Sequence, residues 1–224
     1  MSSQYKTTTS AYQQKYEGGY GLEYPDGHII RIHKQILEYE CGIKGGKILD
    51  YGCGVGQHLQ YFKNQGFAPY GCDIIPAAIE KAKSKMPEYA NNFFAIPNAP
   101  NLKEYFKEKF NVIYSNQVLY YLKDVDMQNL VGQFYDMLLP GGIFFATMIT
   151  PTSYYFKHVE SKEDELSKVV LKGRLDEVTY INFKTREDLE NLFKPFKKLH
   201  IGVYGSIIRE DDGPAEHLIF VGKK

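Results

Sequence analysis

The chain has 224 residues and equal numbers of basic and acidic residues, 27 of each, so its formal net charge is zero. This length is sufficient for one α/β domain with a large core, and the balanced charge argues against a broad nucleic-acid surface, which needs a basic excess. Residues 1–10 are polar, unlike a signal peptide, and no apolar run is long enough to cross a bilayer, so we expect a soluble, cytoplasmic protein that does not interact with a membrane.

The N-terminal segment is rich in tyrosine and poor in aliphatic residues, with five tyrosines in the first 24 residues. Tyr12 and Tyr16 would share one face of a helix, because residues four apart are neighbours on a helical surface. Such a segment is either a mobile tail or a lid that orders over a ligand. The number of aromatic side chains favours the lid, and we expect residues 1–45 to form this cap segment.

Residues 26–40 have the apolar spacing of a helix, and Asp26 is its candidate N-cap. The apolar stripe consists of Ile29, Ile32, Ile36 and Leu37. His28 and His33 lie on or beside this helix. A lone histidine is more often a surface residue or a satisfied partner than a catalyst, so their position alone does not assign them a role.

An apolar strand, 47–50, leads into a loop with glycine at every second position, Gly52-Cys53-Gly54-Val55-Gly56, and then into a helical run, 57–62. Glycine lets a ligand approach the main chain, and the helix N-terminus directs free N–H groups at the same place. A dinucleotide site has the spacing G-x-G-x-x-G. Here the spacing is G-x-G-x-G, and Asp50 would repel a pyrophosphate but suit a cationic group, such as an ammonium near a sulfonium.

The second predicted strand, 67–74, contains Asp73, which stands 23 residues after Asp50. A carboxylate at this distance can bind ribose hydroxyls, as in dinucleotide sites. Pro76 then opens a helix that ends near Lys85, because proline is favoured in the first turn. Further strands are expected at 92–96 and 110–115. The residues of interest after these two strands are Asn98, Ala99, Asn116, Gln117 and Tyr121.

The last third of the chain begins with an amphipathic helix at 125–139, followed by a tight Leu-Leu-Pro-Gly-Gly turn into a strand at 143–148. Residues 150–182 depart from the alternation of strand and helix. We expect their aromatic part to contact the substrate and residues 161–168 to be a solvent-exposed excursion. Thr185 can cap a helix at 186–193, and strands at 199–204 and 217–221 alternate as an antiparallel pair would.

The glycine loop resembles the first motif of the class I S-adenosylmethionine-dependent methyltransferases, (D/E)-x-G-x-G-x-G. Asp50, Gly52, Gly54 and Gly56 match this motif position for position. The strand at 110–115 with its following turn and the Leu-Pro-Gly-Gly stretch are similar to later parts of the same family. The resemblance implies a three-layer, Rossmann-like α/β fold with a seven-stranded, mostly parallel sheet in the order 3-2-1-4-5-7-6 and the last strand antiparallel.

The resemblance also implies a division of the chain into functional parts. It predicts one domain, 1–224, with a cofactor-binding core at 47–149, a substrate-side insertion at 150–182 and a C-terminal helix and strand pair at 183–224. The cofactor would be S-adenosylmethionine, with S-adenosylhomocysteine as product. The implied cofactor-binding residues are Asp50, Gly52, Cys53, Gly54, Gln57, Asp73, Ile74, Asn98, Ala99, Asn116 and Gln117.

The chain departs from the family pattern at three positions. Asn98 stands where an acidic residue commonly binds the adenine amino group, but its side-chain oxygen can accept the same hydrogen bond. Asn111 replaces an aspartate in the strand at 110–115, and Tyr121 stands where histidine is frequent. The strand that ends before Asn116 would face the methyl group in this family, so Asn116, Gln117 and Tyr121 should border the reaction.

The acceptor class is narrowed by motifs that the sequence lacks. No (D/N)-P-P-(Y/F) follows residues 110–115, which argues against the amines of nucleic-acid bases, and no Pro-Cys nucleophile is present there. Ser115-Asn116 does not supply the carboxylate of magnesium-dependent enzymes, so we expect no metal. The remaining class is a small-molecule acceptor methylated on oxygen. A faint resemblance to enzymes that act on a sugar, a phosphoramidate or another surface-glycan precursor points the same way.

Three residues are candidates for catalysis. His28 is the first candidate base and His33 the second, and Tyr121 could orient the acceptor. Two alternative functions stay open: an NAD(P)-dependent oxidoreductase, although no Tyr-x-x-x-Lys hydride-transfer set is present, and a catalytically silent subunit that binds S-adenosylmethionine. The sequence leaves the oligomeric state open.

Overall fold

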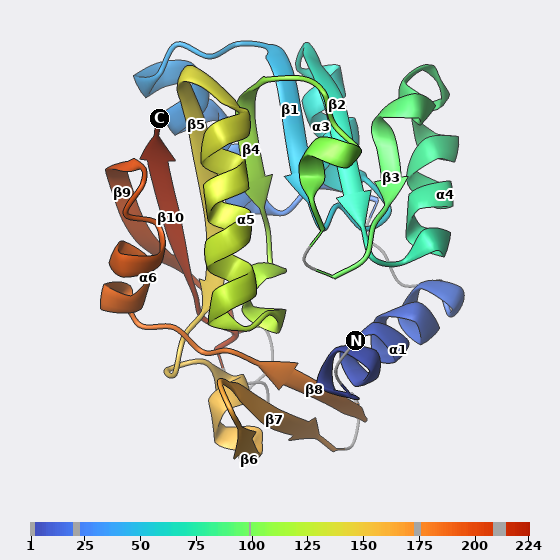
Figure 1. Cartoon of the computed structure of the whole chain (residues 1–224), viewed down its shortest axis with the longest axis vertical. Helices are drawn as coiled ribbons and strands as arrows, with labels where there is room; N and C mark the ends of the chain where they lie inside the picture. The colour runs from blue at the N-terminus through green and yellow to red at the C-terminus, as the bar shows by residue number, and fades with distance from the viewer. Residues whose placement is uncertain (1–2, 20–22, 99, 173–175, 208–213) are drawn as a thin grey trace.

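The computed structural model describes residues 3–19, 23–98, 100–172, 176–207 and 214–224. Its central sheet has seven strands in the order β3-β2-β1-β4-β5-β10-β9 (Figure 1). The strands are β1 (Gly46–Tyr51), β2 (Phe67–Asp73), β3 (Phe93–Ala95), β4 (Phe110–Ser115), β5 (Leu138–Ile149), β9 (Lys197–Tyr204) and β10 (His217–Lys223). β10 runs antiparallel to both of its neighbours, β5 and β9, and the other strands of this sheet run parallel to one another. Numbered within this sheet, the order is 3-2-1-4-5-7-6, so the predicted fold is confirmed.

Helices cover both faces of the sheet, because successive side chains of a strand point to opposite faces. Leu49 and Ile113 belong to a core with α5 and α6, whereas Ile48 and Val112 belong to a second core with α2, α3 and α4. These helices are α2 (Gly27–Arg31), α3 (Gln57–Asn64), α4 (Pro76–Lys85), α5 (Asp124–Met137) and α6 (Arg186–Leu192). Short 3₁₀ segments are η2 (Pro87–Asn92), η3 (Leu102–Glu104), η4 (Leu119–Tyr121) and η5 (Tyr154–His158).

The helix predicted at 26–40 has two parts. After α2 the chain continues as a π-helix, η1 (Ile32–Glu40), in which the Cys41 N–H donates to the Ile36 carbonyl at 2.9 Å, five residues back. Asp26 occupies the N-cap position but makes no capping hydrogen bond. The prediction that its side chain caps the helix is therefore wrong, and the carboxylate is available for contacts elsewhere.

The stretch predicted as a tight turn at 138–142 is the start of β5. Leu138 already pairs with Phe110 of β4, and the register shifts before Val112. Gly141 absorbs the irregularity with a φ of 77°, a conformation that other residues rarely adopt. The pattern Leu-Pro-Gly-Gly therefore makes a bulged strand start instead of a separate turn.

A second sheet consists of three antiparallel strands in the order β6-β7-β8. Its strands are β6 (Val159–Glu163), β7 (Leu166–Leu171) and β8 (Glu177–Ile181). The predicted solvent-exposed excursion is correct for β6, which is mostly exposed, but wrong for the start of β7, where Leu166 is buried. The N-terminal helix α1 (Ser3–Glu17) lies beside β8 (Figure 1), and Lys15 Nζ donates to Glu177 Oε2 at 2.8 Å.

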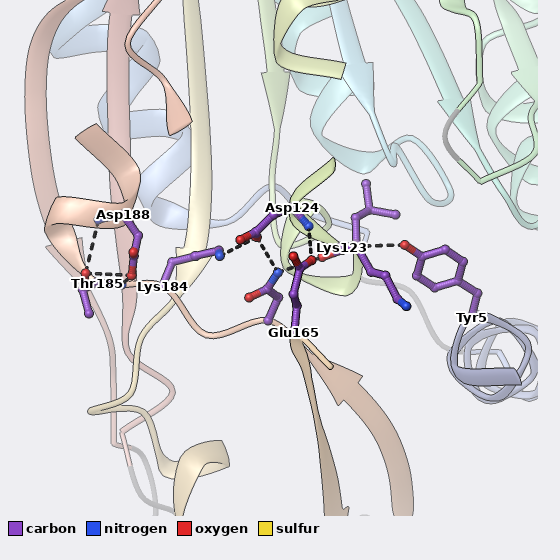
Figure 2. Close-up of polar contacts among 9 residues, drawn as sticks. Tyr5, Lys123, Asp124, Glu165, Lys184, Thr185 and Asp188 are labelled. Atoms are coloured by element: carbon purple, nitrogen blue, oxygen red, sulfur yellow. Dashed lines mark hydrogen bonds and ion pairs between the residues drawn. The ribbon is translucent and has the colours of Figure 1, made fainter. Parts of the chain in front are cut away.

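A polar joint connects this small sheet and α1 to the start of α5 (Figure 2). Asp124 Oδ1 accepts hydrogen bonds from Lys184 Nζ at 2.5 Å and Asn182 Nδ2 at 2.8 Å. The Asp124 N–H donates to Glu165 Oε2 at 2.6 Å, and the neighbouring Lys123 N–H donates to the Tyr5 hydroxyl at 3.0 Å. These contacts place α1 next to the carboxyl edge of the main sheet. Among the described segments, none of the helices has the length and apolar character that crossing a bilayer requires.

Replacing Thr185 with alanine is expected to lower the free energy of unfolding by about 1 kcal/mol. Thr185 Oγ1 accepts from the Asp188 N–H at 3.2 Å, and Asp188 Oδ2 accepts from the Thr185 N–H at 2.8 Å, which is the predicted cap of α6. Urea unfolding measures the change. Thr185→Ser keeps the capping oxygen and serves as the control, and equal losses in both variants would contradict this origin of the effect.

Candidate functional site

A cavity of about 200 Å³ lies at the carboxyl ends of β1, β2 and β4, the edge at which open α/β sheets bind ligands. The predicted site residues that line it are Gly52, Cys53, Gly54, Gln57, Asp73, Ile74, Asn98, Asn116, Gln117 and Tyr121. Ala99 lies outside the described residues. These ten residues are half of the described residues that line the cavity.

The glycine loop can only be built with glycine. Gly52, Gly54 and Gly56 have φ values of 84°, 52° and 78°, in the region that side chains disfavour. A Cβ on Gly52 would lie 2.2 Å from Val118 Cγ2, and one on Gly54 would lie 2.6 Å from the hydroxyl of Tyr16. The main chain of this loop is therefore accessible to a ligand in the cavity. Tyr16 places α1 next to the same loop.

Asp73 ends β2 and faces the cavity with only 9% of its surface exposed. Its two carboxylate oxygens accept hydrogen bonds from the Gly54 and Ile75 N–H groups, each at 2.9 Å. Burial raises its pKa, and these N–H groups oppose the rise. Each carboxylate oxygen has a further lone pair, so Asp73 can hold the loop and accept two ligand hydroxyls at once.

Asp50 does not belong to the cavity wall. It is 1% exposed, and its Oδ1 has no hydrogen-bond partner within the described residues. Burial raises its pKa to about 7, against the opposing influence of His58. Its position beneath the loop does not support the predicted direct contact with a ligand ammonium, and a supporting role for the loop fits better.

His33 lies outside the cavity as well. Its side chain is completely buried, Nδ1 is hydrogen-bonded to the Tyr61 hydroxyl at 2.8 Å, and its ring packs against those of Phe62 and Phe67. Burial lowers its pKa. His33 is therefore a packed core histidine, and its position gives no support to a catalytic role.

An aspartate and a histidine of the cavity wall are among the residues that the sequence interpretation did not name as site residues. Asp26 and His58 both line the cavity, with His58 Nε2 3.4 Å from Asp26 Oδ2. The His58 imidazole holds the pKa of Asp26 below its usual range despite partial burial. Asp26 was assigned to helix capping, and His58 is the second residue of α3, directly after the glycine loop. That adjacency was the signal that could have identified His58.

His28 does not line the cavity, but it is hydrogen-bonded to Asn116, which does, and it belongs to a column of three rings. Its imidazole stacks on Tyr204 with centroids 3.9 Å apart, and Tyr204 stacks on His217 at 5.1 Å. Because β10 is antiparallel, its first residue, His217, lies at the same edge as the ends of the parallel strands. Burial lowers the pKa of His28 and takes that of His217 to about 4.

The N-terminal tyrosines complete the wall. Tyr12 and Tyr16 both line the cavity, and the hydroxyls of Tyr12 and Tyr121 are hydrogen-bonded at 2.7 Å. Lys81 Nζ donates to the Tyr16 carbonyl at 2.7 Å and ties the end of α1 to α4. The helix thus covers the cavity, which at about 200 Å³ is smaller than typical ligand pockets of about 300–1,000 Å³. Opening of this helix as a lid stays a prediction.

A family model described as "Methyltransferase domain" matches residues 23–196. The chain is 26% identical over 127 residues to an uncharacterized methyltransferase of Synechocystis, covering 56% of this chain and 58% of that protein. It is 31% identical over 143 residues to malonyl-[acyl-carrier protein] O-methyltransferase 1 of Ilyobacter polytropus, covering 61% and 51%. The chain spans less than two thirds of the length of these curated relatives.

Solved structures agree on the fold. The 1,6-didemethyltoxoflavin-N1-methyltransferase of Burkholderia thailandensis, solved with its substrate and S-adenosylhomocysteine, superposes with a TM-score of 0.64 at 16% identity, covering 100% of this chain and 91% of that chain. At this identity the likeness concerns the architecture alone. The match to the family model covers most of the chain and shows the protein family as well as the fold.

Proposed function

The chain belongs to the class I S-adenosylmethionine-dependent methyltransferases, and we propose that it transfers the cofactor's methyl group to an oxygen atom of a small-molecule acceptor. Membership in this family leaves the alternative of an NAD(P)-dependent oxidoreductase without support. The single observation that carries the choice of oxygen is a half-buried histidine, His28, bonded to the wall residue Asn116. A hydroxyl acceptor needs a base, whereas a carboxylate or free amine does not.

In this proposal the cofactor lies along the residues that line the cavity. Asp73 accepts the two ribose hydroxyls, because its carboxylate is fixed by backbone N–H groups and faces the cavity. Ile74 and Asn98 border the adenine, and the main chain of Gly52 and Gly54 approaches the methionine part. The bound cofactor supplies an electrophilic methyl group on a sulfonium, which is a good leaving group.

The protein's own contribution to the reaction is alignment, exclusion of water and proton removal. Asp73 and the main chain of Gly52 and Gly54 would hold the cofactor, which would supply the methyl group to the acceptor oxygen and keep the electron pair of the broken carbon–sulfur bond on its sulfur. The hydroxyl proton passes to His28, which is neutral at neutral pH because burial lowers its pKa below 6.5. Alignment can supply up to about 7–11 kcal/mol, and a base a further factor of about 10²–10⁴.

The charges on the cavity wall favour a neutral acceptor. Among the described residues that line it, Asp26 and Asp73 carry carboxylates, and there is no lysine or arginine. A phosphoramidate is anionic and would meet no compensating charge there. A sugar hydroxyl or a phenol fits better, with Tyr121 and Gln117 available to orient it through their polar ends.

Calorimetric titration with S-adenosylhomocysteine, with NADH in parallel, tests the cofactor assignment. We expect binding of the first and none of the second. A screen of sugars, phenols, amines and phosphorylated analogues, followed by S-adenosylhomocysteine release and mass spectrometry of the product, then tests the acceptor. Product methylated on nitrogen would overturn the choice of oxygen, and tight cofactor binding without turnover on any acceptor would favour the catalytically silent subunit.

A further inference from the structure

The side chain of Asn116 is the centre of a hydrogen-bond network at the end of β4. Its Oδ1 accepts from Thr147 Oγ1 at 3.1 Å and lies 2.9 Å from His28 Nε2, and its Nδ2 donates to Asp26 Oδ2 at 3.2 Å. Thr147 Oγ1 in turn accepts from the Gln117 N–H at 2.7 Å. Asn116 is only 8% exposed, so its amide has little water to exchange partners with.

The orientation of this amide is set by its neighbours. An ionised carboxylate can only accept hydrogen bonds, and the pKa of Asp26 is held low by His58. The NH₂ group of Asn116 must therefore face Asp26. The opposite orientation would place the amide oxygen against the carboxylate of Asp26 and the NH₂ group against the hydroxyl of Thr147.

The orientation of the amide determines the state of His28. An amide oxygen cannot donate, so the hydrogen bond between Asn116 Oδ1 and His28 Nε2 requires the proton on Nε2. In the neutral imidazole the other nitrogen then carries the lone pair. Within the part of the chain that the structure describes, Nδ1 of His28 has no hydrogen-bond partner.

We propose that Asp26 is a positioning residue that, through Asn116, holds His28 as the neutral Nε2–H tautomer and leaves Nδ1 free to accept a proton. The tautomer is a property of the protein alone, and only its use in catalysis rests on the proposed function. Asp26, His58, Tyr204 and His217 are the titratable groups that face His28. Asp26 favours its protonation and His58 opposes it.

The test is long-range ¹H–¹⁵N correlation NMR on histidine-labelled protein, which distinguishes the two neutral tautomers and the imidazolium. At pH 7.5 we expect His28 of the wild type to be the Nε2–H tautomer. The informative variant is Asp26→Lys, because an ammonium only donates. It should draw the Asn116 oxygen toward residue 26, turn the NH₂ group toward His28 and move the proton of His28 to Nδ1. Asp26→Asn, which can accept or donate, should give a mixture.

Glu40→Lys is the matched control for charge, because Glu40 is an exposed residue that pairs with His200 on the surface. It should leave the His28 signals unchanged. A wild-type His28 that carries its proton on Nδ1, that is charged at pH 7.5, or that stays Nε2–H in Asp26→Lys would overturn the proposal. Circular dichroism and thermal unfolding verify that each variant is folded before its spectrum is interpreted.

Measuring kcat together with the tautomer tests this inference and the proposed function separately. With a working acceptor, Asp26→Asn should lower kcat in proportion to the fraction of His28 that carries its proton on Nδ1 in the NMR spectrum, since a misplaced tautomer can remove most of a histidine's contribution. A loss that appears in cofactor affinity instead would mean that Asp26, which lines the cavity, acts on the cofactor and not through His28. If the NMR result holds but no hydroxyl acceptor is ever methylated, the tautomer control stands and the proposed function fails. If kcat falls without any change of tautomer, Asp26 acts in another way and the inference fails.

Discussion

Replacing His28 with alanine is expected to lower kcat by about 10²- to 10⁴-fold while leaving the affinity for S-adenosylhomocysteine unchanged. In the proposed function His28 accepts the proton of the acceptor hydroxyl, and it does not line the cavity in which the cofactor is proposed to bind. Burial lowers its pKa below 6.5. Activity of the wild type should therefore be retained at neutral pH and decline only at a pH below the ordinary pKa of histidine, when His28 becomes protonated.

Single-turnover kinetics and calorimetry on the same preparations measure the two quantities separately. His200→Ala is the matched control, because this histidine is exposed on β9 and is paired with Glu40 on the surface. Unchanged turnover in His28→Ala would remove the base from the mechanism and with it the main argument for an oxygen acceptor. A loss of cofactor affinity would instead mean that the imidazole supports the cavity and not the chemistry.

The fold could be predicted because its strands and turns are encoded locally. The run at 47–50, the positive-φ glycines after it and the acidic end of β2 each have a physical signature that does not depend on distant residues. The small sheet β6-β7-β8 could not be predicted in this way. Its strands are short, and β6 is mostly exposed. The sheet is held against α1 and against Asp124 by contacts between segments that are far apart in the chain.

The candidate site also contains residues that could be predicted from local sequence and residues that could not. Asp73 was identifiable from its distance to Asp50, because both end neighbouring parallel strands. Asp26 was not, because at sequence level an aspartate before a helix has capping as its ordinary role, and only the tertiary contact with His58 and Asn116 removes it from that role. His217 could have been found, since the first residue of an antiparallel last strand must lie at the ligand-binding edge.

A second substitution, Asp73→Ala, is expected to weaken binding of S-adenosylhomocysteine by about 100-fold or more. Hydrogen bonds to a charged group contribute about 1.5–3 kcal/mol each, and every 1.4 kcal/mol is a factor of about ten in affinity. Two ribose hydroxyls on one carboxylate therefore account for about two orders of magnitude. Asp73 also accepts from the Gly54 and Ile75 N–H groups, so the variant should loosen the glycine loop as well.

Asp73→Asn separates these two contributions. The asparagine keeps one acceptor oxygen for the backbone and loses the charge and the second acceptor, so its affinity should fall between those of the wild type and Asp73→Ala. Asp136→Ala, which removes an exposed carboxylate paired with Lys103, controls for charge. Because the ribose contacts do not involve His28, cofactor affinity should depend on Asp73 and turnover on His28. Undiminished calorimetric affinity in Asp73→Ala would mean that the ribose lies elsewhere, and the placement of the whole cofactor along this cavity would have to be abandoned.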